Sequence, residues 1–554
     1  LRVTNLRMRN RIINLIVLIT VIMPLIGHTQ NWQWAKHIGS AYQFYGEEAN
    51  VITDGINIYL VGSYGGTLYL PGDTLYSNGN NDIFISKFDA SGNLVWAKTL
   101  GGNYMQPNNH EYARGVFDSI CNCIYVTGNF KNTLDFGNGI TLTSLGTQTD
   151  NFLTRMDTSG NFLWARAMGG IGEERLPYIN VNANGKIYLL TQTADSSHFG
   201  SFFIPPGGGI VQYDSSGNCL SAEIKFSAPV TGNTNGVFLD FIGADLILYG
   251  LYRSTPFQLD TATLITQGNY DGFIARADSN GNVKWIKTYG NAGLDYIQDL
   301  TIDNSYNLYI TGGFQDSINL GGNTIQANSS DIFIAKLDAV GNFIWNTQLS
   351  VTGNYKSPNN IFSDADGNFY LAGLFSGNAN FGTFNINTSN TYDMFISRFN
   401  NNGDCLGVRH FGQASGSSVA VDNSGSAYCA GAFDNTINIG STSMTALLGQ
   451  DIYLAKIDAI TGIGGGEGRM ANNQLLIYAN PNAGKCNITV PDDFVNEKNL
   501  VLSIYDNTGK LIQQKTLEMN DGNIKLNLEQ EAKGVYNVTL ANKKKSYSGK
   551  IVFE

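Results

Sequence analysis

The chain has 554 residues, of which 14% are charged and 12% aromatic, with 64 Gly and a formal net charge of −11. It is too long for one ordinary domain, and many Gly, Tyr and Phe with few charged residues predict an all-β chain of short strands and tight turns. The acidic balance argues against nucleic acid and anionic membrane surfaces as partners, and it also serves solubility.

Residues 1–29 predict a cleavable signal peptide. Arg7, Arg9 and Arg11 precede an almost unbroken apolar run that ends near Ile26, and small or polar residues follow as far as Thr29. The run has about 15 residues, fewer than the roughly 20 that a membrane-spanning helix needs, so a membrane anchor is the less favoured alternative. No later segment is apolar enough to cross a membrane as a helix, so we expect no transmembrane span in the mature chain.

Two sequence phrases alternate seven times through residues 30–461, roughly 60 residues apart. The first leads from an acidic residue through a short apolar strand and a basic residue to Asp-x-x-Gly-Asn, often followed by Trp. Its copies are Asp82–Trp96, Asp150–Trp164, Gly209–Cys219, Asp271–Trp285, Asp331–Trp345, Asp393–Cys405 and Asp451–Gly462. The second is a Tyr-rich strand that usually ends in Gly, at residues 59–62, 125–128, 188–191, 247–250, 309–312, 370–373 and 428–431. Each unit can hold four strands, the content of one blade, so the sequence predicts a seven-bladed β-propeller.

Recurrence also indicates a structural role for the repeated residues. The Asp-x-x-Gly-Asn segments fit hairpin turns in which Asp caps the turn and Gly takes the left-handed conformation. Asp364–Asn368 is spaced like a calcium loop but lacks the downstream bidentate acid, and its siblings are turns, so a turn is favoured. The repeated Trp residues are predicted to pack between blades rather than to stack on sugars; they are Trp34, Trp96, Trp164, Trp285 and Trp345.

The two ends of the repeat array predict how the ring closes. The strand Trp34–Lys36 precedes the first Asp-x-Phe phrase, whereas the equivalent strand Trp96–Lys98 follows its phrase as the second arm of a hairpin. The seventh phrase, which ends at Gly462, has no such arm. We therefore expect the Trp34 strand to complete the last blade, which would leave no exposed sheet edge.

These repeats resemble the β-propeller repeat family of bacterial surface proteins, whose units carry Asp-x-Phe-[Ile/Leu]-x-[Lys/Arg]-x-Asp-x-x-Gly-Asn-x-x-Trp. The resemblance covers about residues 31 to 462, and the unit in which Ser221 replaces Trp precedes the most divergent repeat. The resemblance implies a fold but no fixed chemistry.

Beyond a Gly-rich linker at residues 462–473, residues 474–554 form a second predicted domain. Alternating apolar residues predict a small β-sandwich, immunoglobulin-like, with a hairpin turn at residues 506–509. A Tyr-x-Asn-Pro entry, a Tyr-Asp-x-x-Gly-Lys turn, a Gly-x-Tyr strand and a basic last strand follow in order. The residues that carry them are Asn480, Pro481, Tyr505, Asp506, Gly509, Lys510, Gly534, Tyr536 and Lys550.

This order of motifs resembles the type A C-terminal sorting domain of the type IX secretion system in Bacteroidetes. The resemblance implies passage through the periplasm and across the cell outer membrane, with the secretion machinery as a partner. It also implies that the domain is often removed while the protein is attached to surface lipopolysaccharide. A carbohydrate-binding or immunoglobulin-like sandwich is the alternative.

No catalytic residue, cofactor or metal site is predicted. The chain has no Gly-x-Ser-x-Gly, His-Glu-x-x-His, phosphate-loop or dinucleotide motif. The His residues of the mature chain are isolated in sequence and are interpreted as surface or turn residues; they are His37, His110, His198 and His410. The six Cys include no Cys-x-x-Cys pair, which removes support for a zinc or redox site, and a Cys405–Cys429 bridge within one repeat is conceivable.

The predicted function is that of a secreted or cell-surface protein, monomeric and non-enzymatic, that binds or adheres to a glycan or protein. The loops Asn103–Tyr112 and Phe202–Gly209 have no counterpart in other repeats and are places to look for a ligand. The alternative is a hydrolase or lyase with its site in the propeller channel. One cluster of carboxylates with shifted pKa values, absent from the other blades, would favour the enzyme, whereas repeated apolar or amide residues would favour binding.

Overall fold

The computed structural model describes residues 32–40, 49–78, 81–102, 113–146, 148–172, 174–227, 236–253, 256–322, 324–364, 367–416, 418–458, 460, 462–463, 475–478, 485–490, 494, 499–506, 510–517, 523–542 and 546–553. The elements of these ranges are all β-strands, as the composition predicts. In this part of the chain no helix has the length and apolar character needed to cross a membrane. The predicted signal peptide and most of the linker lie outside the described residues.

Seven antiparallel sheets share a core of four strands, and we number them as blades one to seven. The first, innermost strands are β2 (Asn50–Thr53), β8 (Ala113–Asp118), β14 (Glu174–Val181), β20 (Val237–Ile242), β26 (Tyr296–Ile302), β30 (Lys356–Ser363) and β36 (Ser418–Val421). The second strands are β3 (Ile58–Tyr64), β9 (Cys123–Phe130), β15 (Ile187–Thr193), β21 (Asp245–Arg253), β27 (Leu308–Asn319), β31 (Phe369–Phe375) and β37 (Ala427–Ile439).

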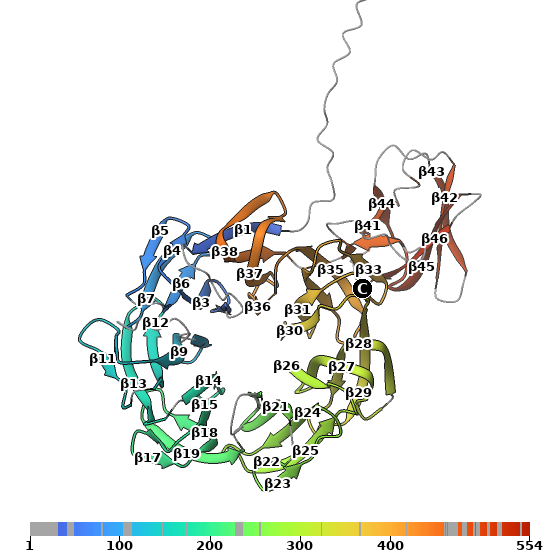
Figure 1. Ribbon diagram of the computed structural model, residues 1–554. Coiled ribbons are helices and arrows are strands. Elements are labelled where there is room, and N and C mark those ends of the chain that lie inside the picture. Colours follow the sequence, from blue (N-terminus) through green and yellow to red (C-terminus); the bar gives the residue numbers. More distant parts are fainter. Residues whose placement is uncertain are drawn as a thin grey trace, which may run out of the picture.

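The repeated phrases form the remaining two strands of each blade. The third strands are β6 (Asp82–Phe88), β12 (Asp150–Asp157), β18 (Gly207–Tyr213), β24 (Tyr270–Ala277), β28 (Thr324–Leu337), β34 (Asp393–Phe399) and β38 (Thr442–Ile457). The fourth are β7 (Leu94–Leu100), β13 (Phe162–Gly170), β19 (Cys219–Phe226), β25 (Val283–Tyr289), β29 (Phe343–Val351), β35 (Cys405–Gly412) and β1 (Trp32–Ser40). Each innermost strand contacts the innermost strands of both neighbouring blades. The blades therefore form a closed ring, the architecture of a β-propeller (Figure 1).

Strand β1 closes this ring, as the sequence predicts. It pairs antiparallel with β38, with Trp34 opposite Lys456 and Ile38 opposite Ile452. The N-terminal strand is thus the fourth strand of blade seven, and its end continues to β4 of blade one through Gly39 opposite Tyr69. The edge of β38 is covered by this pairing.

A short hairpin connects the second and third strands of each blade on the outside of the ring. Separate strands form it in five blades: β4 (Thr67–Leu70) with β5 (Asp73–Tyr76), β10 (Thr133–Asp135) with β11 (Thr141–Thr143), β16 (Ser197–Phe199) with β17 (Phe202–Ile204), β22 (Phe257–Leu259) with β23 (Ala262–Leu264), and β32 (Asn378–Phe381) with β33 (Phe384–Asn387). In blades five and seven it continues from β27 into β28 and from β37 into β38. Phe202–Gly209 is therefore not an extra loop, because it forms β17 and the start of β18. The other predicted loop, Asn103–Tyr112, lies outside the described residues.

The Trp side chains join neighbouring blades. Trp34 Nε1 donates a 3.1 Å hydrogen bond to the carbonyl of Ala90 in blade one, and Trp96 Nε1 donates to Thr158 of blade two at 3.2 Å. The accepting turn packs closely on the indole, since a Cβ on Gly92 would lie 2.7 Å from Trp34, and Gly92 has a positive φ of 76°. The interpretation of the Trp series as packing between blades is thus confirmed for these two junctions.

The repeated Asp at the start of the third strand is a structural acceptor. Asp451 Oδ2 accepts the backbone N–H of Leu447 at 2.9 Å, while its Oδ1 accepts that of Ser40 at 2.9 Å. Asp82 accepts the N–H of Asn78 in the same way. Because a buried carboxylate needs such donors, the recurring Asp maintains the corner between hairpin and blade.

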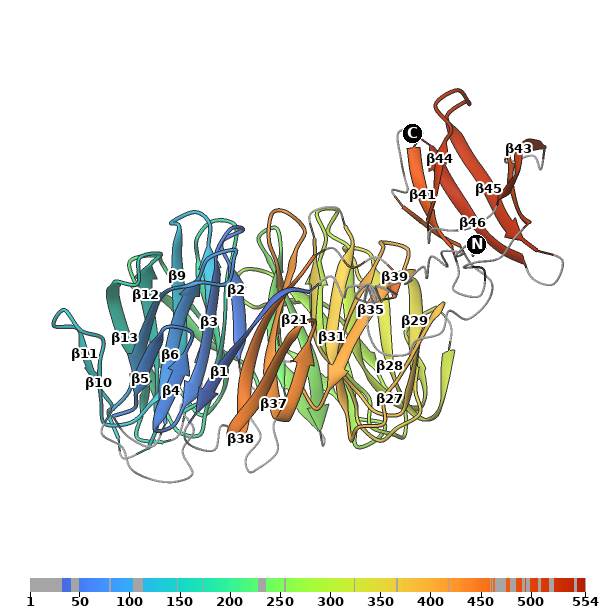
Figure 2. The same ribbon diagram turned by 90° about the horizontal axis from the view of Figure 1, so that it is seen from above.

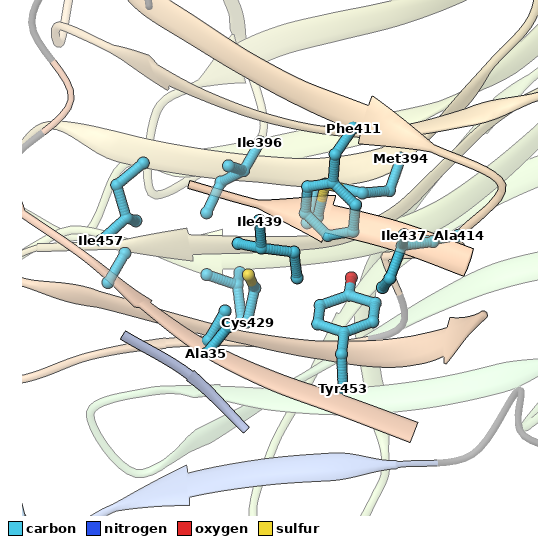
Figure 3. Packing of buried hydrophobic residues seen from close by; sticks show 14 of the residues in the cluster. Ala35, Met394, Ile396, Phe411, Ala414, Cys429, Ile437, Ile439, Tyr453 and Ile457 are labelled. Carbon is cyan, nitrogen blue, oxygen red and sulfur yellow. The ribbon is translucent and has the colours of Figure 1, made fainter. Parts of the chain in front are cut away.

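The hydrophobic core lies between adjacent blades rather than at the centre of the ring. One cluster joins strands of blades six and seven, with Met394 and Ile396 from one side and Cys429 and Tyr453 from the other, all with no exposed surface (Figure 3). Similar clusters occupy other blade junctions. Alternate residues of one strand therefore contact two different neighbours.

The C-terminal region forms two small sheets with a hydrophobic core of their own. One contains β40 (Leu476–Tyr478), β41 (Lys485–Thr489) and β44 (Asn523–Asn527), and the other β43 (Leu511–Leu517), β42 (Leu500–Tyr505), β45 (Gly534–Ala541) and β46 (Ser546–Phe553). The two sheets share one buried cluster, so they make a β-sandwich (Figure 2). A short strand, β39 (Gly462–Ile463), pairs parallel with β35 before the sandwich begins.

Candidate functional site

Residues at the same register position on the seven innermost strands form a belt around the inside of the ring. We call these residues the inner belt: Asn50, Arg114, Tyr178, Phe238, Asp299, Asn360 and Ser418, each opposite the third residue of its Tyr-rich phrase. In blades seven, one and six, the side-chain oxygens of Ser418, Asn50 and Asn360 accept the N–H of a residue on the next innermost strand, at 3.1, 3.0 and 2.7 Å. These amides and hydroxyls tie blades together.

The inner belt changes character in blades two to four. Arg114 lies over the ring of Tyr178 at 5.3 Å, and Tyr178 meets Phe238 edge to face at 5.4 Å. Ring contacts thus replace the backbone hydrogen bonds at these junctions. Arg114 is exposed and Tyr178 and Phe238 are half-buried, so this part of the wall offers aromatic and cationic surface.

Asp299 is the only carboxylate of the inner belt, and its oxygens are occupied. Tyr249 donates its hydroxyl to Oδ1 at 2.9 Å, while Asn360 Nδ2 and the N–H of Ile361 donate to Oδ2 at 2.6 and 2.8 Å. The side chain is buried, and burial raises its pKa. With three donors, Asp299 serves the junction between blades and has little capacity left for a ligand.

Asp240 lies two residues beyond the inner belt on β20, where the repeat is broken. The residue opposite it is Ile247, which stands where most blades have the first Tyr of the phrase. Its Oδ1 accepts the N–H of Phe241 at 2.8 Å and the side-chain amide of Asn180 from blade three at 3.3 Å. Burial, and then the negative charge of Asp299, raise the pKa of Asp240 to about 7. Near neutral pH this half-buried carboxyl can therefore both accept and donate a hydrogen bond.

In the other described innermost strands, the position of Asp240 holds no acid. The equivalent residues are Ile52, Val116, Asn180, Thr301, Phe362 and Ala420. Asp240 and Asn180 thus form a singular polar pair between blades three and four, and the half-buried ring of Phe241, the next residue on β20, packs on Tyr188 at 5.1 Å. This pair is our candidate ligand site.

A second break in the repeat pairs two acids. Asp150 is the structural Asp of blade two. In blades one and five a side chain of the fourth strand, Thr99 or Gln348, donates a hydrogen bond to the equivalent Asp. In blade two the same position, opposite Phe152, is held by Ala167, which cannot donate. Glu174, 1% exposed, takes that place, with Ser197 Oγ donating to its Oε1 at 2.6 Å. The pKa of Glu174 is raised, mainly by burial and further by the negative charge of Asp150. A Cβ on Gly169 would lie 2.5 Å from Asp150 Oδ1 and 2.9 Å from Glu174 Oε2, so the two carboxyls are close and ionisation of both is disfavoured.

Two His residues differ from their sequence interpretation. His410 is buried, with Nδ1 2.9 Å from Asp393, and His37 Nε2 lies 2.6 Å from Asp451, so both are partners of the structural Asp. His198 lies exposed on β16 against Phe203, and His110 lies outside the described residues. His37 also lines an open, mostly apolar pocket of about 610 Å³ at the closing seam, with Gly39, Tyr69, Leu70, Pro71, Leu447 and Leu448.

The cysteine expectations also need correction. Cys405 and Cys429 are both free, so the bridge between them does not form. Cys121 and Cys123 form a disulfide instead, with Cys121 in the turn between β8 and β9 and Cys123 at the start of β9. With Asp118 they make a group of three ligand atoms within 4.8 Å of one another, close enough for a metal ion to contact all three. The sulfurs are bonded to each other, so neither is a thiolate ligand in this state.

The sorting-domain motif is partly within the described residues. Tyr505 lies opposite Asn537, which lies opposite Lys550, so β42, β45 and β46 carry them in one row. Asp506 Oδ1 accepts the N–H of Lys510 at 3.0 Å and closes the predicted turn. Gly534 begins β45, and the Tyr536 hydroxyl donates to the carbonyl of Ala532. Asn480, Pro481 and Gly509 lie outside the described residues.

Sheet topology and tail together define a β-propeller that carries a C-terminal sandwich, and comparison with known families identifies the sandwich. Residues 476–554 match the family described as secretion system C-terminal sorting domain. This tail directs export by the type IX secretion system to the cell surface or the medium. No curated protein matches the chain.

Several solved structures are similar to this chain at low identity. The Dos1 propeller is 10% identical with a TM-score of 0.35, covering 77% of this chain and 97% of its own. Xylan β-1,4-xylosidase from Bacillus halodurans is 9% identical with a TM-score of 0.30, covering 76% and 96%. The endosialidase of phage phi92 is 10% identical with a TM-score of 0.34, covering 93% and 87%.

Proposed function

We propose that this exported propeller is a non-enzymatic glycan-binding protein of the cell surface, with its binding site around Asp240 and Asn180. The carrying observation is the singular carboxyl–amide pair on the innermost strands, at a break in the repeat. Sugars are recognised by such planar polar groups together with aromatic rings, and Phe241 and Tyr178 lie beside the pair on β20 and β14.

The distribution of carboxylates favours binding over hydrolysis. Glycoside hydrolysis uses two carboxyl groups that both reach the scissile bond. Asp240 has a pKa suited to a general acid, but its neighbour Asp299 accepts three hydrogen bonds and is 8% exposed. The acid whose charge acts on Asp240, Asp299, is thus not free to serve as its catalytic partner. A hydrolase remains the second candidate because of that raised pKa alone.

The test is a glycan array with the purified full chain, Asp240→Asn and Asn180→Ala. Asp73→Asn is the matched control, because Asp73 is exposed on β5 of the outer hairpin. We expect at least a tenfold loss of affinity for both inner-strand variants and none for the control. Unchanged binding by both variants contradicts the site, and sugar release that Asp240→Asn abolishes establishes the hydrolase instead.

We further propose that the predicted signal peptide carries the chain into the periplasm before the tail acts. Removal of residues 474–554 is then expected to leave the folded propeller in the periplasm, measured by cell fractionation. Appearance of the truncated protein in the medium or on the surface would contradict the need for the tail.

A further inference from the structure

The turn between β8 and β9 in blade two is built differently from its counterparts. In blades one and five, Asn57 and Asn307 donate their side-chain amides to Asp54 and Asp303 at 2.9 and 2.8 Å, which closes the turn. In blade two, Cys123 stands in place of that Asn, and its sulfur is bonded to Cys121. A covalent bond thus replaces the Asp–Asn clamp at one turn.

The basic residue of the third strand has changed its partner at the same place. Lys336 and Arg398 reach the turn Asp of their own blades, with 3.8 Å to Asp303 and 3.0 Å to Asp364. In blade two the equivalent Arg155 places Nε 3.2 Å from Cys123 Sγ, and its Nη1 donates to the carbonyl of Ser215 at 3.0 Å. The Arg155 guanidinium therefore contacts the sulfur of Cys123.

This exchange leaves an acid beside the disulfide with one oxygen unpartnered, while its other oxygen, Asp118 Oδ1, accepts the N–H of Ile120 at 2.8 Å. Asp118 is 3% exposed, and its Oδ2 has no hydrogen-bond partner among the described residues. A ligand atom of Asp118 and both sulfurs lie within 4.8 Å of one another. A buried carboxylate oxygen without a donor is costly, and the S–H group of a reduced cysteine can supply one.

The disulfide is poorly suited to be only a structural crosslink. The stabilisation that a disulfide gives grows with the length of chain it encloses, and this one spans a sequence separation of 2. Equivalent turns in other blades form with hydrogen bonds alone. The two sulfurs also differ in access, because Cys123 is 1% exposed whereas Cys121 is half-buried and reachable.

We propose that Cys121–Cys123 is a redox-active disulfide that oxidises thiols outside the inner membrane. An external thiolate attacks Cys121 Sγ and forms a mixed disulfide, while the Cys121–Cys123 bond breaks and Cys123 leaves as a thiolate beside Arg155. A second external thiolate attacks the external sulfur of the mixed disulfide, which releases a disulfide of the two external thiols and leaves Cys121 as a thiolate that takes up a proton. The protein gains two electrons and holds a Cys121 thiol facing Asp118 and a Cys123 thiolate beside Arg155, and a small-molecule disulfide restores the Cys121–Cys123 bond by the reverse reaction.

Arg155 and Asp118 act as positioning residues in this proposal. A cation beside the leaving sulfur stabilises the thiolate and speeds exchange. A structural role for Arg155 would change folding stability without changing the exchange rate of the folded protein. The proposal is independent of the glycan site, since the disulfide lies in blade two, whereas Asn180 and Asp240 lie on β14 and β20.

The experiment measures thiol exchange in the purified full chain. The protein is mixed with millimolar reduced glutathione, quenched by alkylation, and the peptide with Cys121 and Cys123 is quantified by mass spectrometry. We expect reduction in the folded state, and a rate about tenfold lower in Arg155→Gln than in the wild type, largely restored in Arg155→Lys. The matched control is Arg398→Gln, because Arg398 has the same strand position in blade six and contacts Asp364.

Two outcomes would overturn the proposal. One is a disulfide that stays oxidised until the protein unfolds, followed by circular dichroism in the same samples. The other is an exchange rate in Arg155→Gln equal to that in Arg398→Gln. The double variant Cys121→Ser, Cys123→Ser checks the structural alternative: we expect it to fold with a melting temperature within a few degrees of the wild type and to lose thiol oxidation.

Discussion

Two halves of the propeller follow the repeat to different degrees. In blades five, six, seven and one, acceptors of the inner belt bind the backbone of the next blade, and the structural Asp of three of these blades has a His or Gln partner. Blades two to four contain ring contacts in the inner belt, the acid pair of Glu174, the carboxyl of Asp240 and the disulfide. The regular half keeps the ring closed, and the irregular half carries the acids and the disulfide that depart from the repeat.

Among the variants that test the difference between the two halves, we expect Asp451→Ala in the regular half to lower the stability of the protein most. The change removes the acceptor of Leu447, Ser40 and His37 from a buried site. We expect a loss of about 3–5 kcal/mol in the free energy of unfolding, measured by urea denaturation. Asp73→Ala on the exposed hairpin is the control, with an expected change below about 0.5 kcal/mol. An equal change in both variants would mean that the repeated Asp does not support the blade.

The closing seam is tested by Trp34→Ala against Trp164→Ala. Both indoles donate at 3.1 Å to a carbonyl of the next blade, but only Trp34 joins the first and last parts of the chain. We expect each change to cost about 2–4 kcal/mol, measured as a shift of the urea midpoint. Limited proteolysis should then cut Trp34→Ala within blade seven or one. If the two variants are cleaved alike, the seam is no weaker than an ordinary junction.

Much of the architecture follows from the sequence, but the site residues do not. The recurring Trp and Tyr phrases reveal the blades because each copy makes the same contact, and the unpaired Trp34 strand reveals the closure. Asp240 has no neighbour in sequence that marks it, since its pKa depends on Asn180 and Asp299 from other blades. The missing Tyr at Ile247 is the one signal that points to it. The sequence does not predict the disulfide, because one residue between Cys121 and Cys123 fits no Cys-x-x-Cys motif and a bridge over so short a segment adds little stability.

The acid pair in the irregular half gives a pH test. Burial and the charge of Asp150 raise the pKa of Glu174 to about 8, above its ordinary value of 4.5, so the folded state holds a proton that the unfolded state releases. Stability from this group is therefore present below pH 4.5 and is lost as the pH rises toward 8. We expect Glu174→Gln, which keeps a donor to Asp150, to flatten this loss by about 1 kcal/mol or more, measured by urea denaturation at a series of pH values. Parallel pH curves for both proteins would contradict the raised pKa of Glu174.

The smallest expected effect concerns Asp240. Burial raises its pKa to about 7, so its contribution to stability is also lost as the pH rises through neutrality. Because the side chain is half-buried, Asp240→Asn should change the pH dependence of unfolding less than Glu174→Gln does. Thermal melts at acidic and alkaline pH measure the difference. A larger effect than that of Glu174→Gln would show that the carboxyl supports the fold and is not reserved for a ligand.

Because strand β1 closes the ring, the propeller can be completed only when the chain extends as far as β38. The first strand of the domain has its partner in β38, more than four hundred residues later, and the sorting tail follows β38. A chain that ends early therefore lacks both the strand that closes its ring and the segment that exports it. Such a fragment keeps an open sheet edge at β1 and has no sorting domain. The order of parts along the chain thus places the export segment after the strand that completes the ring.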